Sequence, residues 1–379
     1  MDEVTMRGNT ADKNSKMRDE YRLPLFKRYP ELEGVIPRVQ LGNFPTPVQR
    51  LSNLGHDNLW IKRDDLSSGN YGGNKVRKLE FVLADAIKKG RDKVITMGGI
   101  GTNHGLASAI FCKKLGLRCK LLLFHQPLNA YVKRNLLLFL KYGAELVYFK
   151  GVFRTAATLL FTQRLLNPRA YIIGAGGSSP LGTLGIVNAM FELKEQIDAG
   201  VLPEPRYIFC PLGSNGTMAG LSLGAMLAGL STTVIGVRVT MDAVGPISIA
   251  TAKTVENLMR KTYALLKKHS RRVPDITIPP QRVIDDYVGE GYGCATIECR
   301  DALALMNDRE GIVLDPTYTA KTFAALCDFI KTPGHEKEPI LFWHTYSSAD
   351  MTKQEQSVDY RALPPVLRRI YETEIKETM

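Results

Sequence analysis

Two short segments of the sequence combine residue types that could do chemistry. Lys75 follows the polar turn 72–74, Gly-Gly-Asn, and stands at the start of an expected helix. The segment 213–217, Gly-Ser-Asn-Gly-Thr, follows an apolar run and opens another expected helix. Backbone N–H groups and hydroxyls at such a helix start can bind a phosphate dianion. A lysine that is partly removed from water beside the cations Arg77 and Lys78 loses proton affinity and becomes a nucleophile.

A nucleophilic lysine together with a phosphate site is the combination that binds pyridoxal phosphate, so this cofactor is our first hypothesis. The residues alone leave the question open. Lysines beside glycines are mostly surface residues, and glycine-rich turns are mostly only turns. The other motifs of the chain therefore decide whether the pyridoxal phosphate hypothesis holds.

Other catalytic motifs fail on position or spacing. The glycines at 99, 101 and 105 have the spacing GxGxxxG rather than GxGxxG, and no acidic residue ends the next expected strand, which argues against a nicotinamide dinucleotide. The GxSxG match at 220–224 falls inside an expected helix rather than at a strand-to-helix turn, so Ser222 is not expected to be a nucleophile. The six histidines lack metal-ligand spacing, and no metal site is expected.

The elements that must position these residues alternate between strands and helices. Strands are expected at 93–97, 118–124, 144–149, 171–173, 207–210 and 234–237, and helices at 103–115, 130–142, after 182 and after 216. Because the links between strands are long enough for crossover helices, we expect mostly parallel sheets with helices on both faces. Ligands in such folds bind at the C-terminal ends of strands.

Composition and charge restrict the function classes only broadly. The chain has 379 residues, 44% of them hydrophobic and 23% charged, which is typical of globular proteins. Its net charge of 50 − 38 = +12 favours anionic partners without choosing among them. The basic stretch 253–272 is interpreted as the solvated face of an amphipathic helix rather than a nucleic-acid patch, so no nucleic-acid partner is expected. Salt-dependent binding of DNA or RNA is the competing hypothesis.

The cellular location and the disordered part of the chain can also be predicted from the sequence. Six scattered cysteines without a CxxC pair, the absence of an apolar signal segment and the absence of an apolar run of about 18 residues favour a cytoplasmic protein without membrane contact. The polar residues 1–20 are expected to be disordered.

Between about residues 40 and 346 the chain resembles the family of D-cysteine desulfhydrases and 1-aminocyclopropane-1-carboxylate (ACC) deaminases. This family belongs to the tryptophan synthase β-like class, fold type II, of pyridoxal phosphate enzymes. The motifs that carry the resemblance are LGNFPTP at 41–47, IKRDD at 61–65, GGNKVRKLE at 72–80, GGIGTNH at 98–104, GGS at 176–178, GTLG at 182–185, GSNGTMAGL at 213–221, GYG at 291–293, DPTYT at 315–319 and LFWHT at 341–345.

The resemblance implies an architecture. It is a two-domain α/β fold with parallel, twisted sheets covered by helices on both faces. We expect a large cofactor-binding domain from residues 1–80 and 188–379, a small inserted α/β domain at 81–187, and the cofactor in the cleft between them. The resemblance also implies a homodimer and a small amino acid as the substrate.

The resemblance further implies roles for individual residues. Lys75 would bind the cofactor covalently and later move protons. The catalytic residues would be Lys75, Thr102, Tyr292 and Tyr318. Cofactor contacts would come from Lys75, Asn74, Asn103, Gly213, Ser214, Asn215, Gly216, Thr217 and Thr345. Substrate contacts would come from Thr102, Asn103, His104, Tyr292, Tyr318 and Thr319.

Two positions separate the branches of this family. Where ACC deaminases have an acidic residue and a leucine, this chain has Thr319 and Thr345, which is the desulfhydrase pattern. A hydroxyl at the pyridine nitrogen does not stabilise a pyridinium as a carboxylate does, which suits loss of a good β-leaving group. The expected reaction is α-proton removal by Lys75 and β-elimination, converting D-cysteine to pyruvate, ammonia and sulfide.

Departures from the family pattern keep alternatives open. Tyr346-Ser347-Ser348 stands where the family has two glycines after the threonine, and Gly101 replaces a larger polar residue, often glutamine. ACC deamination or elimination from another β-substituted amino acid is therefore the alternative within the family. A pyridoxal phosphate-binding protein without turnover is the alternative from another class.

Overall fold

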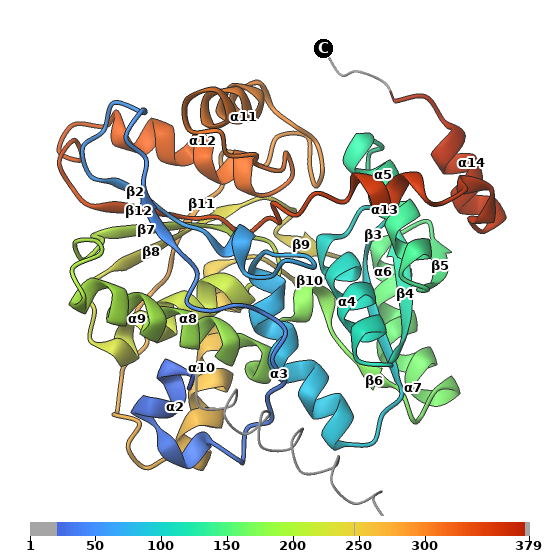
Figure 1. Ribbon diagram of the computed structural model, residues 1–379, viewed down its shortest axis with the longest axis horizontal. Coiled ribbons are helices and arrows are strands. Elements are labelled where there is room, and N and C mark those ends of the chain that lie inside the picture. Colours follow the sequence, from blue (N-terminus) through green and yellow to red (C-terminus); the bar gives the residue numbers. More distant parts are fainter. Residues whose placement is uncertain (1–20, 246, 376–379) are drawn as a thin grey trace, which may run out of the picture.

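The computed structural model describes residues 21–245 and 247–375, so the prediction of disorder for residues 1–20 lies outside the described residues. The described chain is an α/β structure with two main sheets, and helix α3 (Asn74–Lys88) runs between them (Figure 1). A short antiparallel hairpin, β9 (Ala243–Val244) and β10 (Ile247–Ser248), is separate from both. No helix in the described ranges is both long and apolar enough to cross a membrane.

The larger sheet has six strands in the order β1-β2-β12-β7-β8-β11. Their bounds are β1 (Val48–Arg50), β2 (Leu59–Lys62), β12 (Ile340–Trp343), β7 (Tyr207–Leu212), β8 (Thr233–Arg238) and β11 (Arg282–Ile284). All neighbours pair in parallel except β1 and β2. The parallel strands are joined by crossover segments, as the sequence predicts.

Both faces of this sheet are buried. Successive side chains of a strand point to opposite faces, so Ile208 and Cys210 join one hydrophobic cluster whereas Phe209 joins another. The first cluster is closed by α8 (Pro180–Asp198), α9 (Gly216–Ala228), α10 (Ala252–His269) and α2 (Pro24–Arg28). The second is closed by α11 (Ile297–Glu310) and α12 (Thr319–Ile330). The predicted helix-covered sheet is confirmed.

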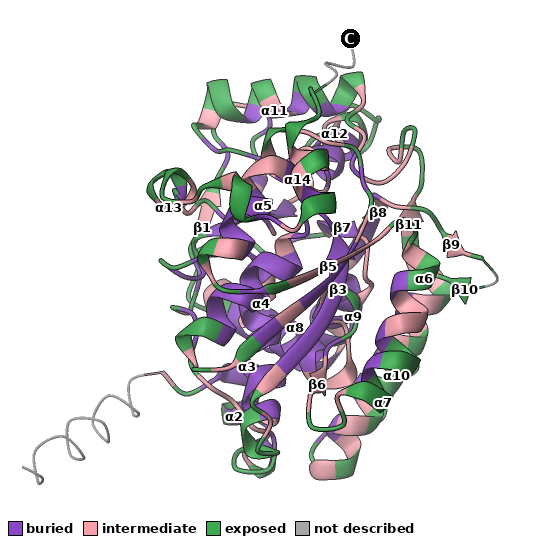
Figure 2. Cartoon of the chain, turned by 90° about the vertical axis from the view of Figure 1, so that its right-hand side faces the viewer, coloured by how far each residue is buried: buried purple, intermediate pink, exposed green. Residues whose placement is uncertain are grey.

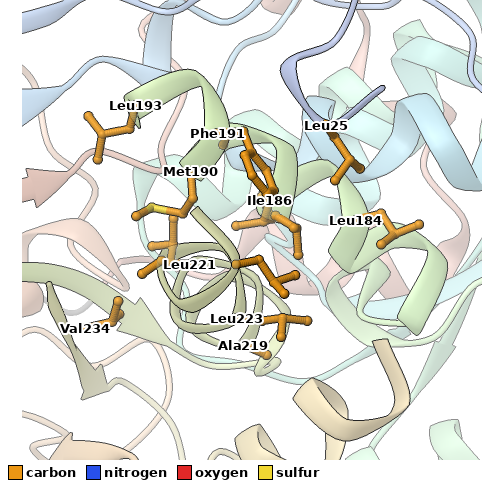
Figure 3. Packing of buried hydrophobic residues seen from close by; sticks show 14 of the residues in the cluster. Leu25, Leu184, Ile186, Met190, Phe191, Leu193, Ala219, Leu221, Leu223 and Val234 are labelled. Carbon is orange, nitrogen blue, oxygen red and sulfur yellow. The ribbon is translucent and has the colours of Figure 1, made fainter. Parts of the chain in front are cut away.

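Buried side chains of α8 and α9, among them Ile186, Met190 and Leu221, gather in the first cluster (Figure 3). A Cβ on Gly220 would lie 2.5 Å from Cβ of Ile186, and one on Gly224 would lie 2.6 Å from Cβ of Met190. The glycines of the GxSxG match are therefore required for helix packing. Ser222 is buried within α9, which confirms that it is not at a strand-to-helix turn.

The smaller sheet has four parallel strands in the order β5-β4-β3-β6. Their bounds are β3 (Lys93–Gly99), β4 (Arg118–Phe124), β5 (Glu145–Phe149) and β6 (Tyr171–Ile172). One face packs on α4 (Asn103–Lys114) and α5 (Ala130–Lys141) through a cluster that includes Leu121 and Leu123. On the other face Leu122 packs with Leu159 of the π-helix η3 (Thr158–Thr162), which lies between α6 (Val152–Ala157) and α7 (Gln163–Leu166). All four strands lie inside the predicted segment 81–187.

The C-terminal segment returns to the smaller sheet. Leu363 and Leu367 belong to the same hydrophobic cluster as Leu121, and helix α13 (Thr352–Gln356) contacts α5. The other short elements are η1 (Pro30–Leu32), η2 (Asp64–Leu66), η4 (Ala175–Gly177), η5 (Tyr360–Ala362) and α14 (Pro365–Glu372). The division of the chain into 1–80 with 188–379 and 81–187 stays a prediction.

Burial follows the predicted pattern along the basic segment as well. In Figure 2 α8 and β3 are mostly buried. Helix α10 alternates between buried and exposed residues along its length. Val255, Met259 and Leu266 of α10 point into the core, and the cations Lys261 and Lys268 do not belong to its buried set. The prediction of an amphipathic helix at 253–272 is confirmed.

Candidate active site

Lys75 is the second residue of helix α3, and backbone hydrogen bonds to two other segments fix the turn before it. The N–H of Gly73 donates to Asp64 O at 2.7 Å, and that of Asn74 donates to Thr345 O at 3.2 Å. Gly73 has φ +91°, and a Cβ there would lie 2.6 Å from Thr345 O, so only glycine fits. The Nζ of Lys75 donates to Asn74 Oδ1 at 3.0 Å.

The Lys75 amine is easily deprotonated. Burial lowers its pKa to about 8, and the negative charge of Asp315 partly offsets this effect. The sequence also predicts that the cations Arg77 and Lys78 lower the proton affinity of Lys75. Arg77 is instead neutralised, because its guanidinium pairs with Asp64 and Glu192 away from Lys75. Desolvation is thus the main cause.

The predicted phosphate segment forms a polar cradle at the N-terminus of α9. Gly216 N and Ser214 Oγ lie 3.2 Å and 3.0 Å from Ser178 Oγ, and Thr217 Oγ1 accepts from Asn74 Nδ2 at 2.7 Å. Asn215 adopts φ +67° and its side chain accepts from Thr254, so it offers its backbone rather than its amide to the cradle. Gly213 precedes these residues at the end of β7.

Lys78 also belongs to this cradle, although the resemblance to the family does not imply such a role for it. Its side chain is fully buried, and its Nζ donates to Ser178 Oγ and Gly176 O, both at 3.2 Å. No carboxylate in the described part of the chain forms an ion pair with it. Burial, with a smaller effect of Lys75, holds its pKa well below the usual value. The available signal was its position three residues after Lys75, which places both lysines on one helix face.

A cavity of about 410 Å³ contains Lys75 and most of the predicted catalytic residues. Thr102, His104, Tyr292 and Tyr318 line it together with Gly213 and Ser214. The Tyr292 and Tyr318 hydroxyl oxygens lie 2.6 Å apart. Burial raises the pKa of Tyr292 to about 12 and that of Tyr318 well above its usual value, so both are neutral hydroxyls near pH 7.

Two further small cavities contain several of the other predicted residues, and the larger of the two is also lined by Lys75. One, of about 30 Å³, is lined by Asn74, Asn103, Asn215, Thr217 and Thr345. Asn103 Oδ1 accepts from Tyr71 and Asn135, both at 3.3 Å, and also lines the second, of about 20 Å³.

The turn between β3 and α4 brings Thr102 and His104 to the large cavity. Thr102 Oγ1 accepts from Gly105 N at 3.2 Å and so caps α4. His104 Nε2 lies 3.0 Å from Thr96 Oγ1, whereas its buried Nδ1 has no hydrogen-bond partner among the described residues. Burial holds the pKa of His104 well below its usual value, so its imidazole is neutral. An unpartnered nitrogen at a cavity wall is suited to bind a ligand.

Gln126 covers the position that Gly101 leaves without a side chain. It is 5% exposed, and its Oε1 accepts from Gly101 N at 3.1 Å. A Cβ on Gly101 would lie 2.7 Å from Val132 Cγ2, so helix α5 approaches too closely for a larger residue there. Gln126 lines the large cavity. No sequence signal singles it out, because it lies in a separate loop.

Asp315 organises the segment that carries Tyr318. Its carboxylate accepts from the backbone N–H groups of Thr317, Tyr318 and Thr319 at 3.2, 3.0 and 3.0 Å. The Thr319 hydroxyl also donates to it, at 2.8 Å. Thr319 is fully buried and lines none of the three cavities, so the structure does not bring its hydroxyl to the predicted substrate site.

The segment that replaces the family's two glycines braces the lysine turn. Ser347 Oγ accepts from Gly72 N at 2.8 Å, and Ser348 Oγ donates to Asp65. Tyr346 is held by Arg134 and lines only the two small cavities, not the large one. The bulk at this segment therefore leaves the large cavity open.

Residues 39–345 match the family described as pyridoxal-phosphate dependent enzyme. The chain belongs to this family. It is 35% identical over 330 residues to the D-cysteine desulfhydrase of Klebsiella pneumoniae, covering 82% of this chain and 93% of that protein. It is 33% identical over 316 residues to a Thermotoga maritima protein named provisionally as a 1-aminocyclopropane-1-carboxylate deaminase, covering 81% and 95%. A solved structure of an ACC deaminase homologue superposes with a TM-score of 0.72 at 32% identity, over 87% of this chain and 97% of that one.

The residues present fit the cofactor of the family, pyridoxal phosphate. Burial disfavours a charge on the Lys78 amine unless an anion lies beside it, and the cradle at Ser178, Ser214 and Gly216 converges on the same place at a helix N-terminus. A Cβ on Gly216 would lie 2.6 Å from Lys78 Nζ, which keeps this place free of side chains. Lys75, one helix turn before Lys78, supplies the amine that the cofactor's aldehyde requires.

Proposed function

We propose that this pyridoxal phosphate enzyme catalyses β-elimination from a small amino acid, with D-cysteine as the first candidate and pyruvate, ammonia and sulfide as products. One observation carries the proposal. A lysine amine with a pKa of about 8 and a pair of neutral tyrosine hydroxyls line the same cavity. The enzyme thus has a base for the α-proton and an acid for the leaving group.

The cofactor would be held at two places. Lys78, Ser214 and Gly216 would bind the phosphate, with Gly213, Asn215 and Thr217 forming the rest of the loop. Lys75 would bind the aldehyde carbon, and Asn74, Asn103 and Thr345 would surround the ring from the adjoining small cavity. When bound, the cofactor supplies an electron-withdrawing ring that stabilises negative charge on the substrate's α-carbon.

Lys75 would take the α-proton. Its amine must be neutral to accept the proton, and a pKa of about 8 keeps a useful fraction neutral near pH 7. The electron pair left at the α-carbon forms the α–β double bond, and the Cβ–S bond breaks with its electrons going to sulfur. The released aminoacrylate takes up water and gives pyruvate and ammonia.

The tyrosine pair would assist the leaving group. One hydroxyl donates to the other, which leaves one hydrogen of the pair free to point into the cavity. That hydrogen can protonate the departing sulfur. The substrate's carboxylate would lie at the N-terminus of α4, where Thr102, Asn103 and the neutral imidazole of His104 are available.

ACC deamination is the second candidate, and the relatives that carry this name favour it. Thr319 and Thr345 favour elimination instead, because neither places a carboxylate at the ring nitrogen. Thr319 acts indirectly if it contributes, since its hydroxyl is bound to Asp315.

The deciding experiment uses purified holoenzyme with D-cysteine, L-cysteine and ACC as separate substrates. Formation of pyruvate and sulfide from D-cysteine supports the proposal, and 2-oxobutanoate from ACC supports the second candidate. If the cofactor's absorption spectrum responds to none of these amino acids, the result supports the third hypothesis, a cofactor-binding protein without turnover.

We further propose a homodimer in the cytoplasm, with the large domain at 1–80 and 188–379 and the small domain at 81–187 closing over the substrate. The position of the site supports closure, because its cavity is lined by segments that follow strands of both sheets. Light scattering of the purified protein and fractionation of the source cells test the assembly and the location.

A further inference from the structure

The cavity around Lys75 has two chemically different ends. At one end Gly176 and Ser214, which follow β6 and β7, belong to the anion cradle. At the other end Phe124 ends β4 and Val152 begins the helix after β5. In the order β5-β4-β3-β6, strands β4 and β5 lie two and three places from β6. At a strand spacing of about 4.8 Å, these ends are about 10 to 14 Å apart.

The far end is apolar. Its wall combines side chains from separate segments that share only their hydrophobic character, Phe124, Val152, Met241, Val244 and Ile249, and Met97 of β3 lines the cavity between the two ends. The polar residues His125, Gln126 and Thr240 also line the cavity, and Glu290, whose side chain carries the carboxylate among the described lining residues, is exposed. Met241 is 49% exposed, and Phe124, Val152 and Val244 are only partly buried, so this wall still contacts water.

With a three-carbon substrate bound, this apolar wall would remain exposed to water. The cofactor's phosphate belongs at the cradle and the reacting carbons belong beside Lys75 and Thr102, between the two ends. A thiol on the β-carbon is too short to cover an apolar wall built from several separate segments. Covering such a wall with an apolar group is favourable by about 25 cal/mol for each Å² removed from water.

Building on the proposed function, we propose that the preferred substrate is an amino acid with a large apolar β-substituent, of about benzyl size, which lies against Phe124, Val152 and Met241. The anchoring end of the substrate is unchanged by this inference. What it assigns is the chemical class of the group beyond the β-carbon.

The test uses ligands that have no leaving group, so it does not depend on elimination. Holoenzyme is titrated with alanine and with phenylalanine, each as both enantiomers, and dissociation constants are read from the change in the cofactor's absorption. We expect phenylalanine to bind at least tenfold more tightly than alanine for the enantiomer that binds better, from burial of the benzyl group. Equal or tighter binding of alanine overturns the inference, and so does the absence of a response to either ligand.

Charge placed on the wall should remove the preference. Met241→Glu and Val152→Glu are each expected to lower the phenylalanine-to-alanine affinity ratio at least fivefold, because a carboxylate in the wall must be desolvated when the benzyl group binds. Met241 is half exposed, so its variant retains the fold even if that of Val152 does not. Val35→Glu is the matched control, since Val35 is 44% exposed and does not line the cavity. An unchanged ratio in both wall variants overturns the inference.

A separate assay tests the reaction. Cysteine, S-methylcysteine and S-benzylcysteine share sulfur as the leaving atom, and pyruvate formation reports elimination from each. We expect kcat/KM to rise at least tenfold from cysteine to S-benzylcysteine. If no pyruvate forms while phenylalanine still binds more tightly than alanine, the proposed elimination fails and the apolar site stands. If cysteine is the best of the three, the inference fails and the elimination stands.

Discussion

The hydroxyl oxygens of Tyr292 and Tyr318 lie 2.6 Å apart at the wall of the Lys75 cavity, and the two rings meet edge to face at 5.9 Å. Because burial raises the pKa of both groups, each oxygen carries a hydrogen near neutral pH. Two oxygens that share one hydrogen bond therefore keep a second hydrogen for a ligand. The pair can donate a proton as a unit, whichever oxygen is the outer one.

Tyr292→Phe and Tyr318→Phe are expected to lower kcat/KM for elimination about a hundredfold each, within the range for loss of a general acid. The double variant should be little worse than either single one, because residues that act as a unit lose their effect together. Steady-state kinetics of all three variants measure this. Tyr142→Phe, at a half-buried tyrosine outside the cavity, should retain full activity. Multiplicative losses in the double variant would show that the hydroxyls act separately.

Lys75 should react with pyridoxal phosphate with a pH dependence centred near its lowered pKa of about 8. Only the neutral amine is nucleophilic, so the rate of uptake by apoprotein should rise tenfold per pH unit below about 8 and level off above it. An ordinary lysine would continue to gain up to about pH 10.4. Borohydride trapping at timed intervals, followed by mapping of the labelled peptide, gives the profile. Lys75→Ala should remain colourless and unlabelled, and a yellow, labelled variant would contradict the assignment.

Asp315→Asn should shift this pH profile downward. The negative charge of Asp315 raises the pKa of Lys75. Because asparagine is neutral, the substitution should move the midpoint of the pH dependence of cofactor uptake below about 8. The variant should also lose stability, on the order of 1 to 3 kcal/mol, because the amide replaces one of the oxygens that accept from Thr317, Tyr318 and Thr319. Uptake profiles and denaturant unfolding measure the two effects. A role confined to holding the loop would lower stability and leave the midpoint in place.

The sequence predicts the framework well because local patterns determine it. The strands Lys93–Gly99 and Arg118–Phe124 and the helix Asn103–Lys114 lie within two residues of their predicted ends, since apolar periodicity and glycine-rich turns act over a few neighbours. The two site segments are local patterns as well, because Lys75 follows the glycine-rich turn 72–74 at the start of α3 and Gly213 directly follows β7.

Contacts between distant segments were beyond prediction from the sequence. Gln126 reaches over Gly101 from another loop, and Ser347 holds Gly72 from 275 residues away. Thr319 was expected at the substrate, but its spacing to Asp315 suits a local bond equally well, and only the fold shows which one forms. Patterns of residue type cannot choose between two partners that both satisfy a hydroxyl.

Lys78→Met should weaken binding of pyridoxal phosphate about 10- to 100-fold, as expected for loss of a hydrogen bond to a charged group, while affinity for pyridoxal, which lacks the phosphate, should change little. The apoprotein should become more stable, because methionine removes a buried amine whose charged form has no carboxylate partner in the described chain. Fluorescence titration with both ligands and thermal unfolding of apoprotein measure these effects. Lys88→Met, at the exposed end of the same helix, is the control. Equal weakening for both ligands would place Lys78 away from the phosphate.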